Sequence, residues 1–189
     1  HRKAVFPAGV SVLLAAMKVL GIETMTYSDG ALREGVMYDM LGRFASEDVR
    51  DRSVQALVER YSVDKRQARR VVKSCERLYE QTHEALGLSG EDNDLLRRTA
   101  YLHEIGLAIS HSGYHHHSSY LLEFSDIPGF SQVDQVRMAQ LARNHRRKLK
   151  SEMLEQVQDI GGRDLVYLCL LLRLAVLVHR SRNDHDKSD

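Results

Sequence analysis

Histidines are concentrated in one short stretch of the chain. The segment HSGYHHHSSY, residues 111–120, contains four of the ten histidines, namely His111, His115, His116 and His117. Imidazoles can bind a metal, donate hydrogen bonds to an anion or transfer protons. No cysteine or suitably spaced carboxylate accompanies them. A metal site and an anion-binding surface are therefore both open alternatives for this segment.

A basic run, RNHRRKLK at residues 143–150, contains five Lys or Arg residues, one histidine and no acid. At the end of a helix, such a run is usually a solvated face that favours the helix dipole. Together with the histidines it could instead bind phosphates, because Lys and Arg pair with phosphate charges. The candidate contacts are His111, His115, His117, Arg146, Arg147 and Lys148. Most of these imidazoles should be neutral at pH 7, so we expect the affinity for an anion to rise as the pH falls toward 6.

A second pattern whose residues could take part in catalysis is YLHEIGL, residues 101–107. It resembles the central motif of HD-type phosphohydrolases, in which an early His, a His-Asp pair and a late Asp hold a divalent metal. The matching positions here are Gln67, His103, Glu104 and Val176. Three of the four depart from the motif, and a valine cannot donate an oxygen. The pattern therefore predicts an HD-like fold without a metal centre.

Two other interpretations of this pattern remain open. A metal-dependent HD phosphohydrolase would use His103, Glu104, His117 and His145. Alternatively, His103 is a helix-end residue that bonds to the last carbonyls of its own helix. Gln67 also has a structural explanation, as the third residue of a capping box in which Asp64 is the N-cap.

Helices must position these side chains. With only two prolines the chain is predicted to be mainly all-α, with one strand at 22–28 between a helix at 10–20 and a helix from Ala31. Residues 1–40 form this helix–strand–helix segment, and residues 41–189 form a helical domain. The later helices are expected at 48–61, 64–86, 92–106, 131–149 and 163–181.

Composition limits the classes of function. The 189 residues suggest one domain, with a fragment of another, and the 43% hydrophobic content is sufficient for a core. The net charge of +1 favours neither a nucleic-acid nor a membrane partner. Cys75 and Cys169 form no CxxC pair, which favours reduced thiols in the cytoplasm. The apolar run 165–178 is too short to span a membrane and contains Arg173. The absence of a first Met suggests a fragment or a processed chain.

Long motifs also resemble a known family. LHEIGLAISHSGYHHHSSYLLEFSDIPGFS, followed by NHRRK, is similar to the C-terminal helical domain of the exopolyphosphatase/guanosine pentaphosphate phosphohydrolase family. YSDGALREGVMYDML, residues 27–41, resembles the end of that family's actin-like catalytic region. The string HSGxHxHSxY is more similar to exopolyphosphatases than to the pentaphosphate hydrolases, which remain the alternative.

The resemblance implies that this chain is part of a longer enzyme, called the parent enzyme here, in which separate regions catalyse hydrolysis and bind the substrate. Catalysis and Mg²⁺ would belong to an actin-like region outside this chain, whose segment GALREG lacks the spacing and the GK[ST] of a P-loop. The HD-like domain would contribute binding of inorganic polyphosphate and homodimerisation, with Arg33 and Glu34 at the junction of the two regions. We therefore expect no hydrolysis by this chain alone, no cofactor within it and a cytoplasmic location.

Overall fold

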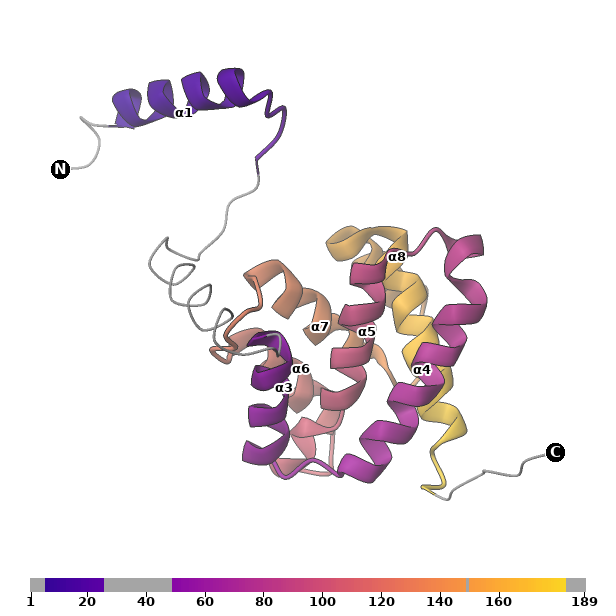
Figure 1. The fold of residues 1–189 in the computed structure, drawn as a ribbon. Coiled ribbons are helices and arrows are strands. Elements are labelled where there is room, and N and C mark those ends of the chain that lie inside the picture. Colours follow the sequence, from indigo (N-terminus) through magenta and orange to yellow (C-terminus); the bar gives the residue numbers. More distant parts are fainter. Residues whose placement is uncertain (1–5, 26–48, 149, 183–189) are drawn as a thin grey trace.

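The chain folds into a bundle of helices, described here from a computed structural model for residues 6–25, 49–148 and 150–182. Every regular element in these ranges is helical, which confirms the all-α prediction. The helices are α1 (Phe6–Leu20), α3 (Val49–Arg60), α4 (Lys65–Leu86), α5 (Gly90–Leu102), the 3₁₀ helix η1 (Ile105–Ala108), α6 (Tyr114–Phe124), α7 (Gln132–Asn144) and α8 (Ser151–Val178). Figure 1 shows α4, α5 and α8 side by side, with α3 and α7 packed on the other side of α5 and α6 packed against α7.

The N-terminal part differs from its prediction. Helix α1 buries none of its residues and lies away from the other helices in Figure 1. The predicted strand is wrong for residues 22–25, which have no regular structure after the left-handed turn at Gly21. Residues 26–28, the helix expected from Ala31, Arg33 and Glu34 lie outside the described residues. None of the described helices is long and apolar enough to cross a membrane.

Apolar side chains at helical spacing from α3 to α8 form one core. Residues such as Val71, Leu96, Leu122, Met138 and Leu172 are completely or almost completely buried. Removing this apolar surface from water is the main source of stability, at about 25 cal/mol per Å². The core therefore fixes how the polar ends of α5, α6 and α7 meet.

The predicted helix boundaries are correct where a capping residue sets them. Asp64 accepts hydrogen bonds from the backbone N–H groups of Arg66 and Gln67, both at 3.0 Å, as expected of an N-cap. The side chain of Gln67 does not complete a capping box, because it contacts Arg70 and the carbonyl of His179 instead.

Other boundaries differ from their predictions because tertiary packing sets them. Helix α5 ends at Leu102, before Gly106, and α7 ends at Asn144. Helix α8 begins at Ser151 and is kinked at Gly161 and Gly162, where the backbone leaves helical angles. The helix predicted from residue 163 is the part of α8 after this kink.

Two capping boxes offer a matched test of how burial changes a cap. In both boxes a serine N-cap and an aspartate three residues later bond reciprocally, Ser89 with Asp92 and Ser131 with Asp134. Asp92 is buried and also binds Arg137 at 2.9 Å. We expect Asp134→Ala to lower the free energy of unfolding by about 1 kcal/mol. Asp92→Ala should cost about 3 kcal/mol, because it also leaves Arg137 without its carboxylate. Urea unfolding of the two variants measures this difference, and equal losses would show that the Arg137 contact contributes nothing.

Candidate functional site

The histidine stretch and the basic run lie next to each other, because α6 packs along α7. Tyr114, the first residue of α6, connects them. Its hydroxyl donates a hydrogen bond to Nε2 of His145 at 3.2 Å, and the guanidinium carbon of Arg146 lies 4.4 Å from the centre of its ring. The ring of His115 meets that of Tyr114 edge-on, with centroids 6.2 Å apart.

The predicted contact residues do not all share this surface. Arg147 and Lys148 are exposed in the turn after α7, and Arg146 is partly exposed. His111 is exposed ahead of α6. His117 is two residues beyond His115, so it lies on the opposite side of α6, beside Gly106.

His115 is a poor partner for an anion. Only 5% of its surface is exposed. Burial first, and then the nearby cations His116, Arg146 and Arg147, lower its pKa to about 4. The expectation that His115 gains charge as the pH falls toward 6 is therefore wrong, since it remains neutral there.

Two residues that were not predicted belong to the surface. His116 is exposed, and its ring centroid lies 4.0 Å from that of His115. Burial lowers its pKa first, followed by the charges of Arg143, His117 and Arg147. Arg143 precedes Arg146 and Arg147 by three and four residues, and this spacing was the available sequence signal. We call His116, Arg143, Arg146 and Arg147 the arginine–histidine surface.

Two buried histidines lie beneath this surface. Nδ1 of His103 bonds to the carbonyl of Ala100 at 2.7 Å, and Nδ1 of His145 bonds to the carbonyl of Ala142 at 2.6 Å. A carbonyl can only accept, so each Nδ1 carries the hydrogen and each Nε2 is an acceptor. The rings meet edge-on at 5.1 Å. His103 is thus the helix-end residue of the second open interpretation, and burial lowers the pKa of both imidazoles.

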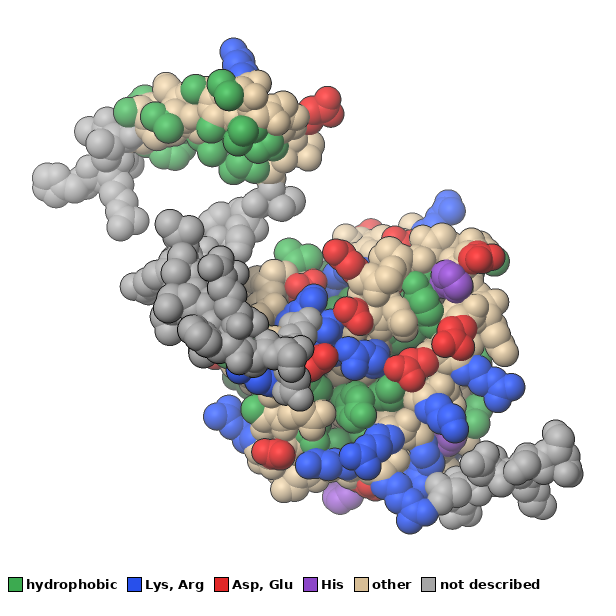
Figure 2. Space-filling model, in the orientation of Figure 1, with side chains coloured by type: hydrophobic (Ala, Val, Ile, Leu, Met, Phe, Trp, Pro, Cys, Tyr) green, Lys and Arg blue, Asp and Glu red, His purple; other side chains and the backbone are tan. Residues whose placement is uncertain are grey.

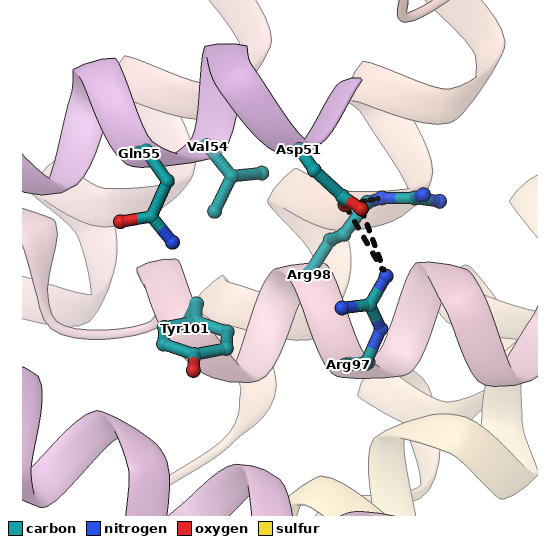
Figure 3. A pocket seen from close by; sticks show the side chains of 6 residues that line it. All are labelled: Asp51, Val54, Gln55, Arg97, Arg98 and Tyr101. Atoms are coloured by element: carbon teal, nitrogen blue, oxygen red, sulfur yellow. Dashed lines mark hydrogen bonds and ion pairs between the residues drawn. The ribbon is translucent and has the colours of Figure 1, made fainter. Parts of the chain in front are cut away.

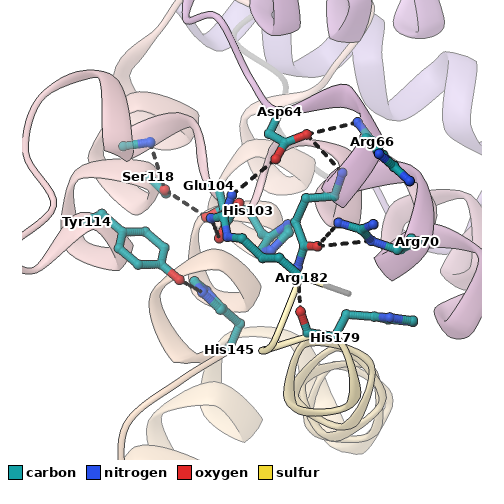
Figure 4. Close-up of polar contacts among 12 residues, drawn as sticks. Asp64, Arg66, Arg70, His103, Glu104, Tyr114, Ser118, His145, His179 and Arg182 are labelled. Carbon is teal, nitrogen blue, oxygen red and sulfur yellow. Dashed lines mark hydrogen bonds and ion pairs between the residues drawn. The ribbon is translucent and has the colours of Figure 1, made fainter. Parts of the chain in front are cut away.

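The positions that matched the HD motif make structural contacts (Figure 4). Both oxygens of Glu104 accept hydrogen bonds from Arg182, at 3.0 and 3.1 Å. Arg182 also binds the N-cap Asp64 at 3.1 Å. Gln67 donates to the carbonyl of His179 at 3.0 Å, and Val176 packs against the core. A guanidinium thus neutralises Glu104, the one carboxylate of this set.

The described residues contain no group of three or more His, Cys, Asp or Glu side chains placed to hold a metal ion. The residues that the metal-dependent alternative would use as ligands also make other contacts instead. Glu104 is paired with Arg182, His145 accepts from Tyr114, and His117 lies beside Gly106. These donors do not fit a metal centre of the HD type.

A small open pocket with a partly polar lining lies between α3 and α5 (Figure 3). It is lined by Asp51, Val54, Gln55, Arg97, Arg98 and Tyr101. Asp51 binds both arginines, at 3.2 and 2.8 Å, and Arg98 also pairs with Asp94. On the face that contains α3, α4 and α5, Lys and Arg are mixed with Asp and Glu (Figure 2). The arginine–histidine surface differs from this face in that its residues come from two stretches of the sequence without acids.

The chain is similar to known proteins over most of its length. Residues 49–189 match the family described as Ppx/GppA phosphatase, domain III, and residues 1–44 match the Ppx/GppA phosphatase family. The chain is 38% identical over 179 residues to a guanosine-5'-triphosphate,3'-diphosphate pyrophosphatase of Aeromonas hydrophila subsp. hydrophila, covering 94% of this chain and 36% of the relative. A protein of the same name from Pseudoalteromonas translucida is 36% identical over 186 residues, covering 97% of this chain and 37% of the relative. The chain thus spans little more than a third of the length of these relatives.

Proposed function

This chain belongs to the Ppx/GppA phosphatase family, and we propose that it serves a phosphohydrolase as a domain that binds the phosphates of the substrate. The observation that carries this proposal is the arginine–histidine surface. It consists of three arginines from the end of α7 and the turn after it, and of the exposed His116 on α6, which packs along α7. Arginine suits this task because its planar fork of N–H groups matches the oxygens of a phosphate.

We propose guanosine-5'-triphosphate,3'-diphosphate as the substrate of the parent enzyme. Both relatives described above are named for the pyrophosphatase that acts on this nucleotide. The histidine-rich string favoured an exopolyphosphatase, which acts on inorganic polyphosphate and is now the second candidate. Both substrates present consecutive phosphates, so the same surface would serve either.

The residues of the arginine–histidine surface would contribute unequally to phosphate binding. Arg143 and Arg147 would carry most of the charge, because both are exposed. Arg146 lies over the ring of Tyr114, a contact that would restrict the positions open to its guanidinium group. His116 would donate a hydrogen bond as a neutral imidazole, since its pKa is lowered.

We further propose that catalysis and Mg²⁺ belong to a region outside this chain, as the family resemblance implies. The absence of hydrolysis by the chain alone remains a prediction. The free, buried thiols of Cys75 and Cys169 are compatible with a cytoplasmic location. Exposed apolar residues of α8, Leu174, Leu177 and Val178, offer a surface for the proposed homodimer.

The test is a titration of the chain with three ligands: guanosine-5'-triphosphate,3'-diphosphate, inorganic tripolyphosphate and long-chain polyphosphate. We expect Arg143→Gln with Arg147→Gln to weaken binding about 10- to 100-fold, because each charged hydrogen bond contributes about 1.5–3 kcal/mol before solvent screening. The salt dependence of binding should also decrease, since fewer cations contact the ligand.

The matched control is Arg60→Gln with Arg163→Gln, which removes two exposed arginines from other places on the chain. It should leave the affinity nearly unchanged. Equal losses in both double variants would reduce the effect to net charge and reject the surface. Tight binding of polyphosphate without binding of the nucleotide would favour the exopolyphosphatase.

A further inference from the structure

We infer that Arg173 is a positioning residue for the arginine–histidine surface. It holds the backbone that carries Arg146 and Arg147, and it does not itself contact the phosphates. This inference rests on the proposed function, because it concerns how the same surface is built. Arg173 is the charged residue inside the apolar run of α8, and the fold and function described so far give it no role.

The contacts of Arg173 all go to one turn. Its Nη1 donates to the carbonyl oxygens of Asn144 and Arg146, the latter at 3.1 Å, and its Nη2 donates to the carbonyl oxygen of Arg147. A single guanidinium thus binds three carbonyls from the end of α7 and the turn after it. Within the described part of the chain, no carboxylate pairs with Arg173. A partly buried cation without an acidic partner needs such polar contacts, since burial of a charge is otherwise costly.

These carbonyls would otherwise disfavour an anion. The last carbonyls of a helix lack partners within the helix, and the helix dipole gives this end a negative partial charge. The arginine–histidine surface lies at that end of α7, so a phosphate bound there would approach the wrong pole of the dipole. Arg173 satisfies the carbonyls and places a fixed positive charge beside them. It therefore makes the end of α7 compatible with anion binding.

The backbone of Arg147 needs the same support. Its φ of 71° lies in the left-handed region, which residues with a Cβ rarely adopt. The hydrogen bond from Arg173 to the Arg147 carbonyl supports this conformation. Without it, we expect the turn to relax and the exposed side chain of Arg147 to change its position.

The experiment compares Arg173→Met with Arg147→Gln and with the double variant, using inorganic tripolyphosphate as the probe. We expect each single variant to weaken binding about 10-fold, which corresponds to about 1.4 kcal/mol. The double variant should be little weaker than Arg147→Gln alone, because Arg173 acts through Arg147. Arg173→Met should also reduce the salt dependence of binding, as Arg147→Gln does, because Arg147 no longer contacts the ligand in either variant, and the double variant should reduce it no further. Arg173→Lys should restore only part of the affinity, because an ammonium cannot bind all three carbonyls in the same geometry.

The control variant is Arg163→Met on the same helix, and it should affect neither affinity nor salt dependence. Multiplying losses in the double variant, or an unchanged salt dependence in Arg173→Met, would overturn the positioning role. Amide hydrogen exchange of residues 145–148 gives a reading without ligand, and unchanged exchange in Arg173→Met would also overturn it. If the unaltered chain fails to bind tripolyphosphate, the proposed function fails and the positioning role in binding falls with it. Faster exchange in Arg173→Met would then show only that Arg173 supports the turn.

Discussion

Lowering the pH from 7 to 5 should destabilise the helical bundle by more than about 2 kcal/mol, because buried histidines must stay neutral in the folded chain. His103, His115 and His145 are all buried, and burial is the largest cause of their lowered pKa values. In the unfolded chain each has a pKa of about 6.5 and takes up a proton. The stability that these residues contribute is therefore complete above pH 6.5. It is lost as the pH falls from 6.5 toward the folded pKa.

The size of this effect follows from proton linkage. A histidine that is neutral when folded and protonated when unfolded costs about 1.4 kcal/mol per pH unit below 6.5. For His115, with a pKa of about 4, the loss at pH 5 is about 2 kcal/mol. His145 and His103 add to this loss, because burial also lowers their pKa values.

Urea unfolding at pH 7, 6 and 5 measures the loss. The paired carboxylates Asp64 and Asp92 also have lowered pKa values, but their contribution is lost near and below pH 4, outside this window. His115→Gln should reduce the dependence on pH by about 1.4 kcal/mol per unit between pH 6 and 5. A free energy of unfolding that stays constant from pH 7 to 5 would contradict the buried neutral state.

At a pH low enough to protonate His145 in the folded chain, the arginine–histidine surface would also change. Nε2 of His145 accepts the hydrogen bond from Tyr114, and a protonated imidazole cannot accept. Tyr114 supports the guanidinium of Arg146. Between pH 7 and 6 the buried imidazoles of His115 and His145 stay neutral, so they do not add the positive charge that was expected from the sequence.

The sequence predicted features that are determined locally. Helical spacing located the core, and Asp64 and Ser131 were recognised as N-caps because a cap depends on neighbouring backbone groups. The two polar stretches were also expected to act together, and α6 does pack along α7.

Features that depend on tertiary packing were not predictable in the same way. No local pattern shows that His115 turns inward while His116 faces solvent, because both belong to one polar run. The partner of Glu104 is Arg182, 78 residues along the chain, and only the fold brings them together. Arg173 was noted for interrupting an apolar run, but its three carbonyl partners depend on where α7 ends.

Gly106→Ala should lower the free energy of unfolding by about 3 kcal/mol or more, because a methyl group has no space at this position. A Cβ on Gly106 would overlap with the carbonyl oxygen of Tyr114 and the amide nitrogen of Ser118, and would lie 2.8 Å from the Cβ of His117. Two of these atoms belong to the backbone of α6, so a change of side-chain rotamer cannot relieve the overlap. Helix α6 itself would have to move away from η1.

This close approach also brings the two polar motifs of the sequence into contact with each other. The N–H of Gly106 donates to the hydroxyl of Ser118 at 2.9 Å, and that hydroxyl donates to the carbonyl of His103 at 2.8 Å. The histidine stretch therefore rests directly on the turn that follows His103. Displacing α6 would move Tyr114 away from His145, so phosphate binding should weaken together with stability.

The matched control for this last prediction is Gly90→Ala at the start of α5. A Cβ there meets no atom within 4 Å, and alanine favours helix by up to about 1 kcal/mol over glycine. Gly90→Ala should therefore leave the melting temperature unchanged or slightly raised, whereas Gly106→Ala should lower it by more than about 10 °C. If Gly106→Ala fails to fold, Ser118→Ala offers a milder variant, which removes both hydrogen bonds without adding an atom and should cost about 2 kcal/mol. Unchanged stability in both variants would mean that the contact between η1 and α6 does not hold the histidine stretch in place.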